Sequence, residues 1–352
     1  MSSMRAEFEV TIATPLSAGW YDPALVDRNF YIRPTEIKGV WRWWARAFAA
    51  GALYEAGCTG PDFLRRVHEI VAERLGLGST KAASRYDLTV EVLERPRVVD
   101  SSRENLQRFR LLNLGRRKGR PAVEYAIGGR FKIILEGDAD IQLVASILAV
   151  ALTLSGIGKG GRKALGSLDI IRVSGAAPRR PLNEIINEIR RQISVQRCGP
   201  PRELPKISAV SNEVFEVYKV NVDFHHLHNM FLRSERARMA KLYYAAPDPL
   251  NQKAWFLGLP REQKGTGYHI NDIEVKRRAS PIFVAWHSIQ HVFGGGGYIS
   301  IFLSQDWPTQ LTWVGESGRK LIQINEQTLR DAKSAFLALL NQFGWKPQRV
   351  WP

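Results

Sequence analysis

The fold of this chain is best predicted from one stretch, Pro34-Thr35-Glu36-Ile37-Lys38-Gly39-Val40-Trp41-Arg42-Trp43-Trp44-Ala45-Arg46, which has the spacing of an amphipathic helix. An α-helix turns by about 100° per residue, so residues three and four positions apart share a face. One face is apolar and is expected to pack in a core, and the neighbouring face is cationic. The apolar face holds Ile37, Val40, Trp41, Trp44 and Phe48, and the cationic face holds Lys38, Arg42 and Arg46.

The cationic face of this helix has two interpretations. It is either the ordinary solvated face of an amphipathic helix or a contact with a polyanion. Composition favours the polyanion, because Lys and Arg number 50 against 34 Asp and Glu, which gives a formal net charge of +16. Such an excess of positive charge is typical of proteins that bind nucleic acids.

Length and composition are those of a globular protein with two domains. The chain has 352 residues, of which 45% are hydrophobic, enough for a core in each domain. Cys58 and Cys198 are too few and too far apart for a disulfide framework or a zinc site, which is typical of a reducing compartment. We find neither a signal peptide nor an apolar run long enough to span a bilayer. We therefore expect a cytoplasmic protein without a membrane partner.

The N-terminal part alternates between strand and helix patterns in the order β-α-β-β-α-β. This order is that of the ferredoxin-like fold, which RNA-binding domains of the RRM type share. We therefore expect an α+β protein with an N-terminal ferredoxin-like domain. The predicted strands are 8–14, 86–93, 129–136 and 167–173, and the predicted helices begin at Thr35 and span 141–154.

A change of composition after residue 173 predicts a domain junction. Five prolines between 174 and 213 bracket one helical pattern at 182–195. We expect an N-terminal domain at 1–175, a linker with one helix at 176–213, and a C-terminal domain at 214–352. The element order of the last part predicts a second ferredoxin-like domain in tandem with the first. Its predicted strands are 214–224, 281–287 and 298–303, and its predicted helices are 234–244 and 326–343.

A glycine-rich stretch at 156–166 matches the pattern G-x-G-x-x-G of dinucleotide sites. The context contradicts that function, because the dinucleotide motif follows a strand and opens a helix, whereas here a helix precedes and a strand follows. A simple flexible turn and a cradle for a nucleic-acid backbone both remain open, and the cations of the stretch favour the cradle. The cations are Lys159, Arg162 and Lys163, and the glycines are Gly156, Gly158, Gly160, Gly161 and Gly166.

Three sequence blocks together resemble the RAMP superfamily of CRISPR proteins. The first is Ile37-Lys38-Gly39-x-x-Arg42-x-Trp44 after Arg33-Pro34, and the second is the glycine-rich loop ending in Ala164-Leu165-Gly166-Ser167. The third is Arg277-Arg278-Ala279-Ser280-Pro281 following Phe256-Leu257-Gly258-Leu259-Pro260. Within this superfamily, the chain is more closely similar to a RAMP subunit of the type III-B (Cmr) effector complex.

The resemblance implies two ferredoxin-like domains, binding of guide RNA and target RNA near one end of the complex, and contacts with other RAMP subunits. It implies no cofactor, no metal and no catalytic residue in this chain. Trp43 lies off the apolar face of the first helix and is expected to stack on a base. The other residues expected to face RNA are Lys38, Arg42, Arg46, Lys159, Arg162, Lys163, Arg277 and Arg278.

Histidines supply the strongest alternative, a metal-independent endoribonuclease that processes guide precursors. Strand alternation would place His226 and His228 on one face beside His225, where they form a surface pair, a metal-trapping pair or a general acid and base. His287 and His291 have the spacing of a zincin helix but lack its glutamate. A second alternative is a basic scaffold that meets an acidic protein and not RNA. We expect a non-catalytic RNA-binding subunit.

Overall fold

The computed structural model describes most of the chain. All statements below concern residues 4–19, 21–113, 122–137, 140–201, 203–230, 253–259, 261–263, 266–270, 277–315 and 318–352.

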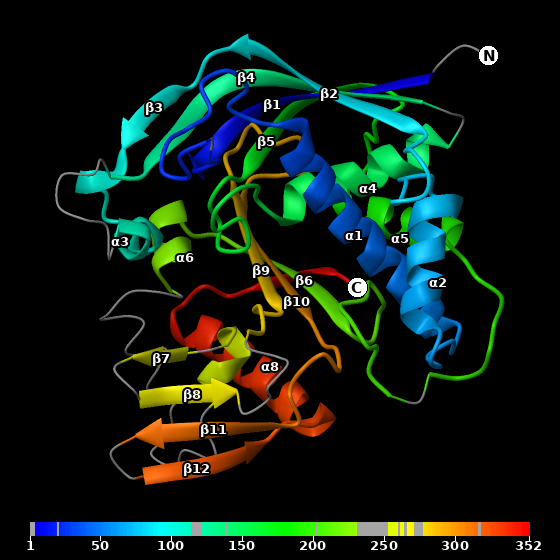
Figure 1. Ribbon diagram of the computed structural model, residues 1–352, viewed down its shortest axis with the longest axis vertical. Coiled ribbons are helices and arrows are strands. Elements are labelled where there is room, and N and C mark those ends of the chain that lie inside the picture. Colours follow the sequence, from blue (N-terminus) through cyan, green and yellow to red (C-terminus); the bar gives the residue numbers. More distant parts are fainter. Residues whose placement is uncertain are drawn as a thin grey trace.

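The N-terminal domain is built on an antiparallel sheet whose strand order is β2-β4-β1-β5, with β3 also paired to β4. Alternate residues of β1, among them Phe8, Val10 and Ile12, are buried, which confirms the predicted half-buried strand. Helices α1 and α4 cover the inner face of this sheet (Figure 1). The strands are β1 (Met4–Leu16), β2 (Tyr86–Glu94), β3 (Arg97–Asp100), β4 (Glu124–Gly137) and β5 (Leu168–Gly175).

Helix α1 (Pro34–Glu55) contains the amphipathic stretch 34–46, and its apolar face packs in the core as predicted. Trp41 is fully buried, and its indole Nε1 donates to the carbonyl of Val144 on α4 (Ile141–Leu154) at 2.8 Å. Trp44 donates to Ser155 Oγ at 3.0 Å. Shorter elements surround this core: α2 (Phe63–Glu69), the π-helix η1 (Ile70–Arg74), the 3₁₀ helix η2 (Ser101–Arg103), α3 (Gln107–Asn113) and α5 (Leu182–Gln192).

The C-terminal domain repeats the same architecture. Its main sheet has the strand order β13-β6-β10-β9, which is again the ferredoxin-like order 4-1-3-2. The predicted tandem of ferredoxin-like domains is thus confirmed, although the predicted helix at 234–244 lies outside the described residues. The elements are β6 (Phe215–Val220), α6 (Phe224–Met230), the 3₁₀ helix η4 (Ala254–Leu257), β9 (Ile282–His287), β10 (Gly296–Phe302), α8 (Glu326–Gln342) and β13 (Gln348–Trp351).

A second small sheet in the C-terminal half is absent from the sequence prediction. It has the strand order β12-β11-β8-β7 and lies below the main sheet in the view of Figure 1. Its two hairpins interrupt the ferredoxin-like order, one before β9 and the other between β10 and α8. The strands are β7 (Arg261–Gln263), β8 (Thr266–Ile270), β11 (Gln310–Gly315) and β12 (Gly318–Gln323).

The two domains are joined by backbone hydrogen bonds along β9. The end of the glycine-rich loop runs beside this strand, where Ala164 N–H donates to Val284 O at 2.8 Å and Val284 N–H donates to Arg162 O at 3.1 Å. Further along, Trp286 N–H donates to Ser167 Oγ at 3.1 Å. The edge of β9 is therefore covered by the N-terminal domain, and the glycine-rich loop belongs to the joint between the domains.

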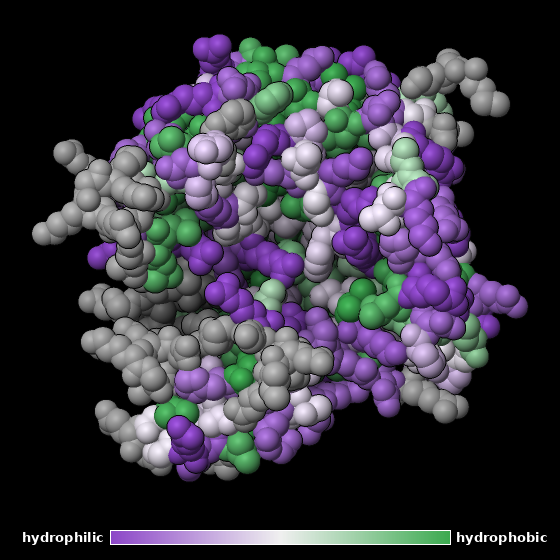
Figure 2. Space-filling view, viewed as in Figure 1, coloured by the Kyte–Doolittle hydropathy of each residue, from purple (hydrophilic) through white to green (hydrophobic). Residues whose placement is uncertain are grey.

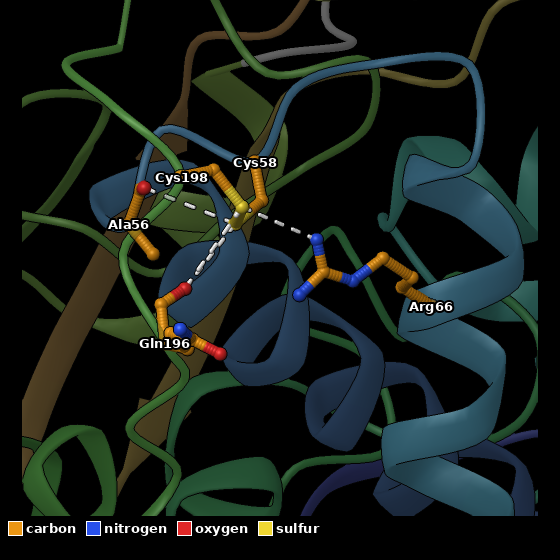
Figure 3. The surroundings of a disulfide bond; sticks show 5 residues. All are labelled: Ala56, Cys58, Arg66, Gln196 and Cys198. Atoms are coloured by element: carbon orange, nitrogen blue, oxygen red, sulfur yellow. Dashed lines mark hydrogen bonds between the residues drawn. A yellow bond between two sulfur atoms is a disulfide. The ribbon is translucent and has the colours of Figure 1, made fainter.

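The prediction from the cysteines was wrong, because Cys58 and Cys198 form a disulfide (Figure 3). Their Cα atoms are 5.1 Å apart although 140 positions separate them in the sequence. The fold brings them together: Cys198 N–H donates to the carbonyl of Ala56, just after α1, at 2.7 Å. Arg66 Nη1 lies 3.4 Å from Cys198 Sγ. Sequence separation alone therefore did not exclude this pairing.

Among the described residues, every helix is too short or too polar to cross a lipid bilayer.

Candidate nucleic-acid interface

Helix α1, the glycine-rich loop and β9 meet around one open pocket of about 250 Å³. Gly39 and Trp43 of α1 face Gly156, Gly158 and Gly161 of the loop, and Phe283 of β9 completes the wall from the other domain. The opening helix and the glycine-rich loop therefore converge in space. The remaining lining residues are Val40, Trp44, Ser155 and Arg162.

Arg162 places a positive charge in this pocket, and the nearby Asp306 offsets it only in part. Its guanidinium carbon lies 4.5 Å from the ring centroid of Phe283 and 5.5 Å from that of Trp43. Burial lowers the pKa of this guanidinium, and nearby Arg278 adds to the effect. No hydrogen bond or ion pair joins the guanidinium to another described residue. Because an arginine stays charged and a largely buried charge needs a partner, the pocket suits an anion.

The glycine-rich loop is more rigid than either sequence interpretation assumed. Its glycines are required by the loop itself: Gly158 and Gly160 have positive φ angles, and a Cβ on Gly156 would lie 2.0 Å from Leu165 O. Most of its amides are not free to cradle a phosphate, because they donate to protein carbonyls. These are the amides of Gly156, Ile157, Lys159, Gly161, Lys163, Ala164 and Gly166.

The two lysines of the loop hold neighbouring segments in place. Lys159 donates from its Nζ to the carbonyl of Pro23 and from its backbone N–H to Ser17 O at 3.0 Å. The carbonyl of Lys163 accepts a hydrogen bond from His228 Nδ1 at 2.7 Å, and the lysine side chain is half-buried. Both residues therefore have structural roles, and Arg162 supplies the charge of the pocket.

The cations of α1 flank the pocket. Along the helix, Lys38, Arg42 and Arg46 lie on a strip next to the one that carries Gly39 and Trp43. Lys38 and Arg42 are half-buried, Arg46 is exposed, and none of the three forms an ion pair with a described residue. Arg42 donates to Leu77 O, and burial together with Arg46 lowers its pKa. The strip is thus positive and not neutralised. Figure 2 shows hydrophilic residues over much of one face of the molecule.

Trp43 is less available for stacking than the sequence suggested. Its ring centroid lies 4.5 Å from that of Phe283 and 5.5 Å from that of Phe302, and Arg162 lies over it. Trp43 is half-buried and contributes an edge to the pocket, so it is mainly a contact between the two domains.

The two arginines of the third sequence block lie in different environments. Arg277 is exposed, whereas Arg278 is only 9% exposed. Arg278 donates from Nη2 to Asp306 Oδ1 at 2.7 Å and lies 4.8 Å from the ring centroid of Trp307. This internal ion pair disfavours direct contact between Arg278 and RNA. Asp306, which accepts these bonds, had no signal in the sequence.

The histidine cluster at 225–228 is helical and not a strand. His225 and His226 are exposed, whereas His228 is fully buried. His228 donates from Nδ1 to Lys163 O and accepts at Nε2 from Arg108 N–H at 3.4 Å. Burial lowers the pKa of His228 to about 4. With both ring nitrogens occupied, His228 fixes the glycine-rich loop and is not placed for acid–base chemistry.

His287 and His291 form a buried polar cluster with Asp169 of β5. Each residue has one side-chain nitrogen or oxygen that could bind a metal ion, and these atoms lie within 4.8 Å of one another. His291 Nδ1 accepts from Ile170 N–H at 2.9 Å, and its Nε2 lies 3.2 Å from Thr153 Oγ1. Each ring nitrogen of both histidines already has a protein partner. The arrangement therefore suits hydrogen bonding across the domain boundary better than metal binding. Sequence spacing identified the histidines but not Asp169.

The outer face of the N-terminal sheet is occupied by ion pairs. RRM-type domains use this face for RNA, with aromatic side chains that stack on bases. Here Arg5 pairs with Glu7 at 2.6 Å, and Arg130 pairs with Glu9 at 3.2 Å and Glu94 at 3.0 Å. The described residues on this face are charged, aliphatic or small, without an aromatic ring. The pocket at α1 is therefore a better candidate for RNA than the sheet.

Comparison with known proteins finds similarity over the N-terminal part of the sequence. A model of the RAMP superfamily matches residues 9–169, which include α1 and the glycine-rich loop. Cmr1-1 of Pyrococcus furiosus, described as a subunit of a CRISPR Cmr system, is 31% identical over 154 residues. That match covers 41% of this chain and 41% of the relative, so it spans less than half of either protein.

Solved structures agree with the fold over nearly the whole length. The crystal structure of apo Cmr1 from Pyrococcus furiosus matches with a TM-score of 0.55 and 20% identity, covering 99% of this chain and 98% of that one. A chain in the cryo-EM structure of type III-B Cmr-beta bound to cognate target RNA gives a TM-score of 0.56 and 13% identity, covering 96% and 100%. Residues 9–169 of the chain therefore match the RAMP superfamily, and the fold of the whole chain is that of the compared structures. Within that superfamily the chain is similar to Cmr1.

Proposed function

We propose that this protein is a non-catalytic RNA-binding subunit of a type III-B Cmr complex. In this proposal it contacts the backbone of guide or target RNA near one end of the complex and binds other RAMP subunits. The likeness to Cmr1 and to a chain of an RNA-bound Cmr-beta complex supports this assignment. The charge of Arg162, which forms no ion pair with a described residue and lies in a pocket built by both domains, is the observation that carries it.

The geometry of the pocket explains how a phosphate chain would be held. Phosphate needs cations and close approach, and the glycines of the pocket present backbone without side chains. Arg162 stands inside the pocket, while Lys38, Arg42 and Arg46 extend the positive surface along α1. RNA would then cross from the N-terminal helix toward β9 without using the ion-paired sheet.

Salt dependence of RNA affinity tests this function. For the purified chain and a labelled single-stranded RNA, log affinity should fall linearly with log salt, by about 0.7 per phosphate contact. Arg42→Gln and Arg46→Gln should each make this slope shallower. Lack of RNA binding at about 100 mM salt would favour the protein scaffold.

Incubation with repeat RNA in EDTA separates the proposed function from an endoribonuclease. We expect the RNA to stay intact, because His228 has both nitrogens occupied and His226 pairs with Asp223. Discrete cleavage that disappears in His226→Ala would establish the nuclease instead. Co-purification with the other subunits of a Cmr complex tests assembly separately.

A further inference from the structure

Two aromatic side chains are exposed on the loop that joins β1 to α1. Tyr21 is 96% exposed and Phe30 is 49% exposed. Among the residues that the structure describes, no other Phe, Tyr or Trp side chain is as exposed as these two. Single exposed apolar residues are common on proteins, but a tyrosine that is almost completely solvated, on a loop that contacts the glycine-rich loop, is a candidate for binding.

The loop with Tyr21 is fixed against the glycine-rich loop. Ser17 O accepts a hydrogen bond from Lys159 N–H at 3.0 Å, and Pro23 O accepts one from Lys159 Nζ. A Cβ on Gly158 would lie 2.8 Å from Ser17 O, so the two backbones are in direct contact. Tyr21 stands between these two anchors. The loop that carries Tyr21 therefore contacts Gly158, which lines the pocket together with Arg162.

Local hydrogen bonds make the backbone around Tyr21 rigid. Ala24 N–H donates to Asp22 Oδ1 at 2.8 Å, and Leu25 N–H donates to Asp22 O at 3.0 Å. Gly19 O accepts from Arg33 Nη2 at 2.6 Å and pairs across the loop with Val26. A ring on such a backbone loses little conformational entropy when it binds, because only its own side-chain torsions are restricted.

We propose that Tyr21 stacks on an unpaired base of an RNA strand whose backbone lies in the Arg162 pocket. This inference rests on the proposed function and adds a specificity to it, namely single-stranded RNA in preference to a duplex. Bases in a duplex are already stacked and paired, whereas an unpaired base offers a free face to an aromatic ring. Arg162 in the pocket next to Gly158 and the formal net charge of +16 favour RNA as the occupant over an apolar protein surface.

Affinity measurements on the full chain test the role of Tyr21. The probes are a labelled oligouridylate of about eight nucleotides and a blunt RNA duplex of the same length. We expect Tyr21→Ala to weaken binding of the single strand by about 5- to 100-fold, the range of one base stacked on an aromatic ring. The salt slope should not change, because Tyr21 carries no charge. Duplex affinity should not change either, and Tyr21→Phe should restore the single-strand affinity.

Ile289→Ala is the matched control, because Ile289 is 97% exposed and lies on another loop, after β9. It should bind like the parent protein. If the wild-type chain binds the single strand and Tyr21→Ala binds it with the same affinity, this inference is overturned and the proposed function stays intact. A wild-type chain that binds no RNA would overturn both. If Tyr21→Ala instead lost assembly with other subunits while keeping its RNA affinity, the loop would be a protein contact and the inference would be wrong.

Discussion

Asp169 of the N-terminal domain and His287 of the C-terminal domain face each other across the domain boundary, with Oδ1 and Nδ1 2.9 Å apart and both side chains buried. The other ring nitrogen, Nε2, lies 2.8 Å from the carbonyl of Thr153. Ser288 Oγ donates to the second carboxyl oxygen, Oδ2, of Asp169. A buried hydrogen-bond network therefore links the two ferredoxin-like domains.

Replacing Asp169 with Asn should strongly destabilise the protein. The change removes one carboxyl oxygen of Asp169, whose two oxygens bond His287 Nδ1 and Ser288, and a buried polar group left unsatisfied costs about 1–3 kcal/mol. Chemical denaturation would measure the loss in the free energy of unfolding. Glu326→Gln breaks an exposed pair with Arg330 on α8 and should cost far less. Equal losses in the two variants would contradict a stabilising buried hydrogen-bond network between the domains.

Reduction of the disulfide should lower stability but not RNA affinity. A link between positions 140 apart restricts the unfolded chain strongly, and the chain-entropy model gives about 5 kcal/mol for such a loop. The disulfide follows the last turn of α1, whereas the pocket lies along its first half. Dithiothreitol should therefore lower the thermal midpoint of the parent protein and leave a Cys58→Ala, Cys198→Ala double variant unchanged. A midpoint that does not respond to reductant would show that the disulfide is absent in solution.

Stability should fall as the solution becomes more acidic, in part because of His228. Burial lowers the pKa of His228 from its ordinary value to about 4, so the folded state holds this ring neutral while the unfolded state accepts a proton. The loss begins below the unfolded pKa and is complete below the folded one, and it amounts to about 3 kcal/mol. Urea denaturation between pH 7 and about pH 4 should show a shallower dependence in His228→Gln. An unchanged dependence would mean that His228 is not buried as a neutral ring.

Gly39 offers a way to fill the pocket without disturbing the fold. A Cβ at this position would have nothing within 4 Å, although the residue lies inside α1. Gly39→Ala should therefore raise the free energy of unfolding by up to about 1 kcal/mol, because alanine favours the helix. Gly39→Glu should remain folded but lose RNA affinity, since it adds bulk and negative charge where phosphate would lie. If Gly39→Glu bound RNA like the parent protein, RNA would not use this pocket.

The fold was largely accessible from periodicity. Helix α4 spans the predicted residues, 141–154, because an apolar run bounded by polar residues has little alternative to a buried helix. The small sheet of β7, β8, β11 and β12 was missed, since β7 and β12 lack the alternation that marks a half-buried strand and all four strands are short. The cluster at 225–228 was misassigned as a strand because a seven-residue helix gives too short a pattern to distinguish the two periods.

The candidate site was only partly accessible from sequence. The cations of α1 and the glycine-rich loop were identified because charge and glycine content can be read directly from the amino-acid sequence. The burial of a side chain cannot be read from the sequence. The sequence therefore could not distinguish Arg162, which faces the pocket, from Arg278, which pairs with Asp306. Phe283 and Asp169 were missed because their contacts come from the other domain and have no local signal.

The salt dependence of RNA affinity in Arg162→Gln tests the central claim most directly. Arg172→Gln is the matched control, because Arg172 is an exposed arginine on the outer face of the sheet and its loss changes the net charge equally. The thermal midpoints of both variants show whether they remain folded. We predict that Arg162→Gln weakens binding and makes the slope of log affinity against log salt shallower by about 0.7. Arg172→Gln should bind like the parent protein. Identical slopes and affinities for the parent protein and both variants would contradict the account.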